Sequence, residues 1–311
     1  MEWYFILLIV LGSLILITLG ICLYVYFRIF YNDNKGKPET LEPLRGKLYD
    51  PFFDRSSELI KKALAIPYEQ VTLKVNKHKT LCARYYFVKE NAPTSILVHG
   101  YKGNGIRDFS GGVNEVIKRE NNVLVIDHYG HNLSSGRNIT FGVKEKYDVL
   151  RWIDYINKRN NNPDIYLYGI SMGAATVLMC SGLNLPTNVK AIIADSPYAS
   201  IKEELKFFIK NMGLSFKLLY PFIFLSALIF ARFNIRKGEV KNYLENNKLP
   251  ILLIHGTTDD IVPVTNSRYL KEQFPNINYL EVEGAPHGLS YFVDYDRYAK
   301  ELDKFLNQIS K

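Results

Sequence analysis

The hydrophobic pattern begins with residues 3–27, a stretch without a charged side chain. A helix of this length reaches about 37 Å, which is enough to cross a bilayer with some tilt. A secretory signal peptide would instead combine a basic start, a shorter apolar core and a small-residue cleavage site. Here Glu2 is the only charged residue before the run. The pattern therefore favours an uncleaved transmembrane anchor over residues 1–31.

Charge around this stretch predicts its orientation. Basic residues follow it and none precedes it; they are Arg28, Lys35, Lys37, Arg45 and Lys47. Because cytoplasmic flanks carry the excess of Lys and Arg, we expect a single-pass protein of the cell membrane whose main domain faces the cytoplasm. The three cysteines, Cys22, Cys82 and Cys180, show no disulfide spacing, which agrees with this orientation.

Residues 32–50 are polar, contain Gly and Pro and show weak periodicity, so we expect a linker, with bounds 32–55. An amphipathic helix is predicted over 56–66, followed by strands at 71–75 and 80–88 around a polar turn. The rest of the chain, 56–311, is predicted to form one catalytic domain.

Short, wholly apolar runs then alternate with amphipathic segments. The runs span 95–100, 122–127, 165–169, 189–196 and 250–256, and the predicted helices 109–120, 143–159, 171–183, 265–274 and 294–309. Wholly apolar strands are typical of a sheet that is covered on both faces. The predicted fold class is α/β, with a mostly parallel, doubly wound sheet that binds its ligand at the carboxyl ends of the strands.

The alternation is interrupted at about 198–247. This insertion contains the apolar stretch 218–231, which is too short to cross a bilayer and includes Pro221. We expect a helical cap over the active site with an apolar inner face. A helix that dips into the membrane and a second span remain open as alternatives.

Composition narrows the function classes. The 311 residues carry a net charge of +8, which fits a basic surface or one that lies near anionic lipid. We expect no nucleic-acid partner, because no basic run, RNA motif or basic helix is present. One clear span cannot form a channel or transporter pore alone.

Candidate chemistry centres on Gly169-Ile170-Ser171-Met172-Gly173, which follows an apolar strand and begins a small-residue helix. In this strand–turn–helix setting, a sharp turn exposes the serine hydroxyl, and the two glycines leave room for closely approaching backbone. Ser171 is therefore the predicted nucleophile, with Gly169 and Gly173 as the glycines of the elbow.

A serine nucleophile needs a base, and six histidines are available. His287 lies in the loop between the last strand and the last helix, from which it can reach over the sheet, so we predict it as the base. His99 and His255 are interpreted as bracing their own turns. The others are less suitable: His128 and His131 lie on another loop, and His78 in a hairpin turn.

The orienting acid is predicted to be Asp259, after the penultimate strand. Asp260 is the alternative, more simply explained as a helix N-cap or a solvent-facing neighbour. Asp195 is a weaker alternative, and Asp127 is interpreted as bracing its loop. The resulting chain order is Ser171, Asp259, His287.

An acyl-transfer intermediate also needs preorganised donors for its oxyanion. The backbone N–H of Met172, directly after the nucleophile, is one predicted donor. The other is the backbone N–H of Tyr101, in the loop after the first parallel strand.

From about residue 67 to 310, the chain resembles an α/β-hydrolase. The resemblance is carried by HGYKGN, DHYGHNLSSG, GISMGA, ADSPY, HGTTDDIVP and the final HG, in the order of that family. Within it the chain resembles bacterial hydrolases with a membrane anchor, described as serine-aminopeptidase-like or acyl-thioesterase-like. The second loop departs from the common Asp-x-Arg-Gly-x-Gly, since residues 127–132 lack the arginine.

The resemblance implies hydrolysis of an ester, thioester or amide through an acyl-serine, without metal or organic cofactor. A carboxylic ester of a small or lipid-like acyl substrate is favoured over a peptide. A catalytically silent binding or scaffolding module at the membrane is the alternative.

Overall fold

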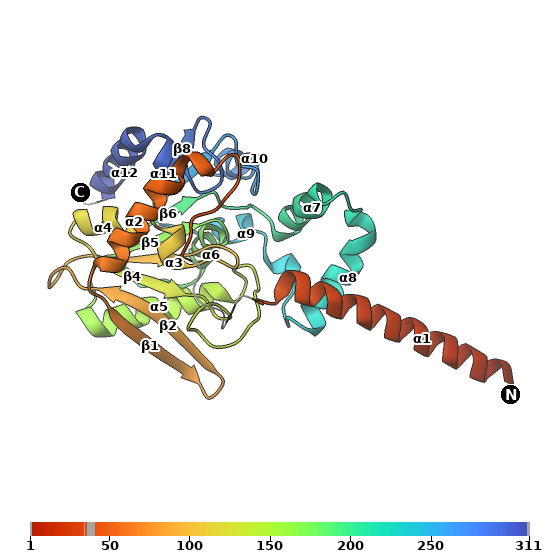
Figure 1. The fold of residues 1–311 in the computed structure, drawn as a ribbon. Coiled ribbons are helices and arrows are strands. Elements are labelled where there is room, and N and C mark those ends of the chain that lie inside the picture. Colours follow the sequence, from red (N-terminus) through yellow and green to blue (C-terminus); the bar gives the residue numbers. More distant parts are fainter. Residues whose placement is uncertain (1, 34, 36–40, 310–311) are drawn as a thin grey trace.

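Eight strands form one sheet in the order β1-β2-β4-β3-β5-β6-β7-β8 (Figure 1). The computed structural model describes residues 2–33, 35 and 41–309, so Lys37 and part of the predicted linker lie outside it. The strands are β1 Glu69–Asn76, β2 Lys79–Tyr86, β3 Thr94–Val98, β4 Asn122–Asp127, β5 Ile165–Ile170, β6 Val189–Asp195, β7 Ile251–Gly256 and β8 Asn278–Val282.

The antiparallel pairs are β1 with β2 and β2 with β4, and every pairing from β4 through β8 is parallel. The expected mostly parallel sheet is thereby confirmed, and so is its doubly wound arrangement. Successive side chains of β3 face opposite layers: Ile96 and Val98 pack into one core, and Leu97 into the other. Both faces of the central strands are buried, which explains their uninterrupted apolar sequence.

Helices cover both faces of the sheet (Figure 1). One layer contains α5 Glu145–Asn160 and α6 Met172–Cys180, and α6 packs on β5 and β6. The other layer contains α2 Phe53–Ala65, α4 Gly112–Lys118 and α12 Tyr295–Ile309. Helix α10 Thr265–Gln273 packs on β7, and its Leu270 belongs to the same core as α6. Shorter helical segments are α3 Gly105–Asp108, α11 Ser290–Val293 and the 3-10 turn η2 Asp50–Phe52.

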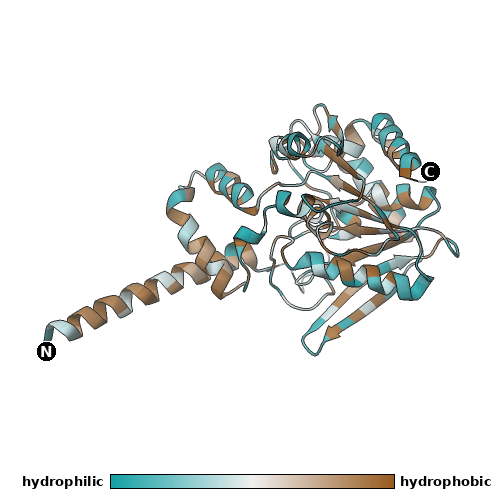
Figure 2. Ribbon diagram, turned by 180° about the vertical axis from the view of Figure 1, so that it is seen from behind, coloured by the Kyte–Doolittle hydropathy of each residue, from teal (hydrophilic) through white to brown (hydrophobic). Residues whose placement is uncertain are grey.

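The amino-terminal helix α1, Glu2–Val25, projects from the domain and is hydrophobic around its whole circumference (Figure 2). Together with the π-helical turn η1, Tyr26–Phe30, it is long and apolar enough to span a membrane by length and composition. Its last turn belongs to the domain core. Phe30 is fully buried, with its ring 6.0 Å from that of Phe141 and 5.5 Å from that of Phe233. The last residues of the predicted anchor, 1–31, are therefore packed in the core of the catalytic domain rather than separated from it.

The insertion at 198–247 forms α7 Ile201–Asn211, α8 Phe216–Ile229, the 3-10 turn η3 Ile235–Lys237 and α9 Lys241–Leu244. Helix α8 packs along α1, and both are predominantly hydrophobic in Figure 2. The two apolar helices cover part of each other's surface, while Leu218, Leu228 and Ile229 remain exposed.

Candidate active site

The backbone at Ser171 makes a sharp turn between β5 and α6. Its φ of 56° and ψ of −122° lie outside the regions that most residues adopt. Gly169 and Gly173 make this turn possible. A β-carbon at Gly169 would overlap the backbone of Gly173, and one at Gly173 would overlap the carbonyl oxygen of Val98. The turn therefore has the strained geometry expected of a nucleophile elbow.

The His287 ring is held by Asp259, which follows β7. His287 Nδ1 lies 2.7 Å from Asp259 Oδ2. Because an ionised carboxylate only accepts, Nδ1 carries the proton and Nε2 is left as the basic nitrogen. The other Asp259 oxygen accepts from the backbone N–H groups of Ile261, at 3.0 Å, and Val262, at 2.8 Å. The carboxylate is thus fixed by the turn in which it lies.

A second histidine contacts the same carboxylate. His255 Nε2 lies 3.1 Å from Asp259 Oδ2 and 2.9 Å from the carbonyl oxygen of Val262. Its Nδ1 lies 2.7 Å from Ser267 Oγ. His255 braces its turn, as the sequence indicates, but its contact with Asp259 was not expected. The sequence contained one indication of this contact: His255 and Asp259 are four residues apart across a tight turn.

Burial and charge act in opposite directions on this pair. Burial raises the pKa of Asp259, but the charge of His287 and hydrogen bonds from both histidines outweigh it and hold that pKa well below its usual range. Burial lowers the pKa of His287, but the adjacent Asp259 carboxylate reverses this, so the pKa of His287 is raised above its ordinary value. The carboxylate therefore stabilises the protonated imidazole.

The other aspartates considered from the sequence form hydrogen bonds with residues other than His287. Asp260 accepts a 2.8 Å hydrogen bond from the hydroxyl of Tyr49. Asp195 accepts one of 2.9 Å from Ser196, and burial raises its pKa to about 6. Asp127 accepts from Asn132 and braces its loop. Among these carboxylates, Asp259 is the one within hydrogen-bond distance of His287.

The loop after β3 brings Tyr101 to the same place. Gly100 lies against Ser171, and both line one pocket with Tyr101. In the part of the chain that the structure describes, the backbone N–H groups of Tyr101 and Met172 have no hydrogen-bond acceptor. Met172 is also the first residue of α6, where an N–H has no partner within the helix. Both predicted oxyanion donors are thus available.

The π-helical turn η1 and the residue Asp33 after it contact the loop that holds Tyr101. The hydroxyl of Tyr101 donates a 2.8 Å hydrogen bond to the carbonyl oxygen of Ile29, and its ring stacks on Phe141. The ammonium of Lys102 pairs with Asp33 at 2.7 Å. The predicted anchor therefore contacts a loop that holds a predicted oxyanion donor, which no local sequence pattern indicates.

Three buried histidines lie behind the same loop. The ring centroids of His128 and His131 are 4.6 and 4.9 Å from that of His99. Burial lowers the pKa of His99 and of His128 to about 3, so these rings are neutral near pH 7. His99 Nδ1 contacts the carbonyl oxygen of Gly100, as expected for a histidine that braces its turn. Within the described ranges, no group of three or more His, Cys, Asp or Glu residues could hold a metal ion.

Ser171 and His287 line a common pocket of about 230 Å³. No hydrogen bond joins their side chains among the described contacts, and such bonds often form only when substrate binds. Most of the wall is apolar. Its side chains include Leu44, Ile170, Ile261, Leu289 and Phe292.

The predicted linker supplies part of this pocket. Pro43, Leu44 and Tyr49 line it together with Ser171, and Tyr49 is 8% exposed and bonded to Asp260. The segment 43–49 is therefore part of the site as well as a connection to α1. Its extended, aperiodic sequence gave no signal of this role.

The insertion at 198–247 does not line the pocket of Ser171. None of the described residues lining the pocket comes from 198–247. Helix α8 packs along α1, whereas Glu204 of α7 lies near enough to His287 to help raise its pKa, so the cap with an apolar inner face stays a prediction. The apolar wall facing Ser171 comes from the segment 43–49 and the loops around the strand ends.

The chain is similar in sequence to several known proteins. A family model described as serine aminopeptidase, S33, matches residues 90–232. An uncharacterised protein of Bacillus subtilis, YqkD, is 26% identical over 73% of this chain and 75% of its own length. The lysophosphatidylserine lipase ABHD12 of Rattus norvegicus is 25% identical over 58% of this chain, which spans 45% of the lipase.

Solved structures share the fold. An esterase of Pyrococcus furiosus superposes with a TM-score of 0.64 and 23% identity, covering 80% of this chain and 95% of the esterase. Est1E from Butyrivibrio proteoclasticus, solved with ferulic acid bound, has a TM-score of 0.62 and 23% identity, covering 78% and 100%. At this identity the likeness establishes the fold, not the substrate.

Proposed function

We propose that this chain, which has the α/β-hydrolase fold, is a member of the α/β-hydrolase superfamily and acts as a membrane-anchored serine hydrolase. Ser171, His287 and Asp259 are its proposed catalytic residues. The proposed reaction is cleavage of a carboxylic ester, thioester or amide through an acyl-serine, with an ester preferred.

One observation supports the chemistry most strongly. His287 is bonded to Asp259 at 2.7 Å and lines the same pocket as Ser171, whose backbone is strained. A structural serine in an ordinary turn needs none of these features. Their occurrence together supports a nucleophile with an oriented base.

The proposed mechanism assigns a proton path. His287 Nε2 accepts the proton of Ser171 as Oγ attacks the carbonyl carbon, and Asp259 stabilises the imidazolium that forms. The amides of Tyr101 and Met172 bind the developing oxyanion. The imidazolium then protonates the leaving group, and a water molecule that His287 deprotonates hydrolyses the acyl-serine.

The substrate proposal rests on the pocket. Its largely apolar wall suits an acyl group, and its volume of about 230 Å³ lies below the range of roughly 300–1,000 Å³ typical of drug-sized ligands. We therefore expect short acyl chains to bind best. The names of the relatives, a lysophosphatidylserine lipase and esterases, also support an ester substrate.

The membrane proposal rests on α1 and its flanks. The helix is apolar along its length, and the basic residues Arg28, Lys35 and Arg45 follow it. We propose a single membrane-spanning anchor with the hydrolase domain on the cytoplasmic side.

Hydrolysis of p-nitrophenyl esters of graded chain length, compared with aminoacyl amides, tests the proposal. The full chain should hydrolyse short esters faster than amides. Ser171→Ala should reduce kcat by about 10⁶-fold, as for other serine triads. The matched control is Ser181→Ala, which removes a buried serine hydroxyl from the other end of α6.

Comparable rates in Ser171→Ala and in the wild type would contradict the assignment. A well-folded wild type that hydrolyses neither esters nor amides would favour the silent binding module instead.

A further inference from the structure

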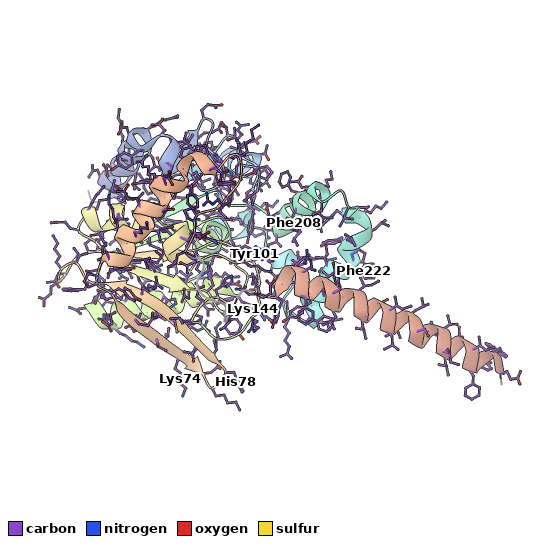
Figure 3. The ribbon with its side chains drawn as sticks, in the orientation of Figure 1. Lys74, His78, Tyr101, Lys144, Phe208 and Phe222 are labelled. Atoms are coloured by element: carbon purple, nitrogen blue, oxygen red, sulfur yellow. The ribbon has the colours of Figure 1, made fainter. Side chains whose placement is uncertain are left out.

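A basic cavity lies on the face of the domain near the end of α8. It has a volume of about 890 Å³, and five cationic side chains line it: Lys144, Lys146, Arg232, Arg236 and Lys237. No described residue that lines it is acidic. In Figure 3, Lys144 lies on the side of the domain from which α1 and α8 project. The cavity does not share a residue with the pocket of Ser171.

These cations lack acidic partners within the described chain. None of the five forms an ion pair with a described carboxylate, whereas Lys79 and Arg151 nearby both pair with Asp148. Glu145, which lies between two of them in sequence, is buried and accepts hydrogen bonds from Thr140 instead. The lining of the cavity therefore carries an excess of positive charge, which the nearby Glu145 offsets only in part.

Lys146 is the most informative of the five because its side chain is 2% exposed. Its ammonium donates to the carbonyl oxygen of Val143, at 2.8 Å, and to the hydroxyl of Tyr243, at 3.0 Å. An ammonium has three N–H donors, so the third is without an oxygen acceptor, although the rings of Tyr147 and Tyr243 lie 4.8 and 4.5 Å from the nitrogen. Burial lowers the pKa of Lys146. A buried cation without a direct ion pair is costly, and a bound anion would reduce that cost.

The surroundings identify the kind of anion. Leu228 of α8 lines the cavity, is 40% exposed and belongs to the helix that packs along α1. The ring of Phe230, just after α8, lies 5.8 Å from that of Tyr26 at the end of the anchor. If α1 spans the bilayer, this end of α8 lies at the membrane surface, where acyl chains meet α8 and headgroups meet the cavity.

We propose that this cavity binds the phosphate of an anionic lipid headgroup, with the acyl chains of that lipid against the exposed apolar side chains of α8. Arg232, Arg236, Lys237 and Lys144 supply charge at its rim, and the buried Lys146 supplies a fixed donor. The proposal depends on the membrane position of α1 but not on hydrolysis at Ser171.

Thermal unfolding of the full chain in neutral detergent micelles tests this site. Dioleoylphosphatidylglycerol should raise the unfolding temperature, and dioleoylphosphatidylcholine at the same mole fraction should not. The exposed pair Arg236→Gln/Lys237→Gln should weaken phosphatidylglycerol binding about 25-fold, because each basic side chain near an anionic surface contributes about a factor of five. Ser171→Ala should retain the full shift, which separates this site from the proposed catalysis.

The matched control removes two exposed cations from the same insertion but outside the cavity, Lys210→Gln/Lys217→Gln. It should keep the response to phosphatidylglycerol. An equal loss in this control would show diffuse attraction and overturn the site. So would an equal shift with inorganic phosphate at the same concentration, which would mean that a soluble anion is the ligand.

Discussion

Replacing Asp259 by Asn tests the orientation of the proposed base, because the two side chains have nearly the same shape. Asp259 Oδ2 is 2.7 Å from His287 Nδ1, and its other oxygen accepts two backbone amides. Asparagine can keep the amide contacts only by turning its NH₂ group toward His287. That favours the tautomer with the proton on Nε2, which cannot accept from Ser171. The equivalent change in another serine triad costs about 10⁴-fold in kcat.

The pH profile gives a second, independent signal. Because the pKa of His287 is raised above its ordinary value of about 6.5, wild-type activity should rise with pH through a pKa above that value. Asp195 and Glu204 also favour the charged imidazole, so Asp259→Asn should move this acidic limb to lower pH without abolishing it. The assay is kcat for p-nitrophenyl acetate between pH 5 and 10.

The matched control is Asp260→Asn, one residue along the same loop. Its carboxylate accepts from Tyr49 rather than from His287, so a change of a few-fold at most is expected. A loss below tenfold in Asp259→Asn, or an acidic limb that stays in place, would refute the orientation argument.

Further predictions concern the neighbouring contacts. Tyr101→Phe keeps the backbone N–H but removes the 2.8 Å bond to Ile29, so kcat should fall about five- to tenfold with little change in KM, measured by ester kinetics. Leu44→Ala enlarges the pocket wall and should shift the preferred p-nitrophenyl ester to a longer acyl chain; an unchanged preference would exclude this segment from substrate binding. Phe30→Ala removes a fully buried ring and should lower the free energy of unfolding by about 3 kcal/mol in denaturant titration, whereas Phe27→Ala, at an exposed position in the same turn, should cost under 1 kcal/mol. Unfolding should also depend on pH with opposite signs: stability from the depressed pKa of Asp259 is lost as pH falls below about 4, and stability from the raised pKa of His287 is lost as pH rises through that pKa.

The sheet and the elbow were predictable because their signals are local. Strands β3 to β7 are mostly apolar runs with Gly, Asp or His at or next to the end of each, and each was expected within one or two residues of its observed bounds. Ser171 was identifiable because the glycines at 169 and 173 are required by contacts inside one strand–turn–helix unit. Steric contacts within a short segment, and burial of both faces of the sheet, leave few alternative interpretations of these strands and this turn.

The contacts that were missed join segments far apart in the sequence. Tyr49 is hydrogen-bonded to Asp260, and Tyr101 to Ile29, and hydrophobic periodicity gives no indication of either contact. The position of the insertion depended on which apolar surface α8 would cover. Both α1 and the active-site rim offered such a surface, and hydropathy alone does not distinguish them.

Labelling with a fluorophosphonate, followed by peptide mass mapping, tests the proposed nucleophile most directly, since the reagent phosphonylates an activated serine. The account predicts one adduct, on Ser171, that is lost in Ser171→Ala, greatly slowed in His287→Ala and retained in Ser181→Ala. An adduct on another serine, or no adduct on a well-folded wild-type chain, would contradict it.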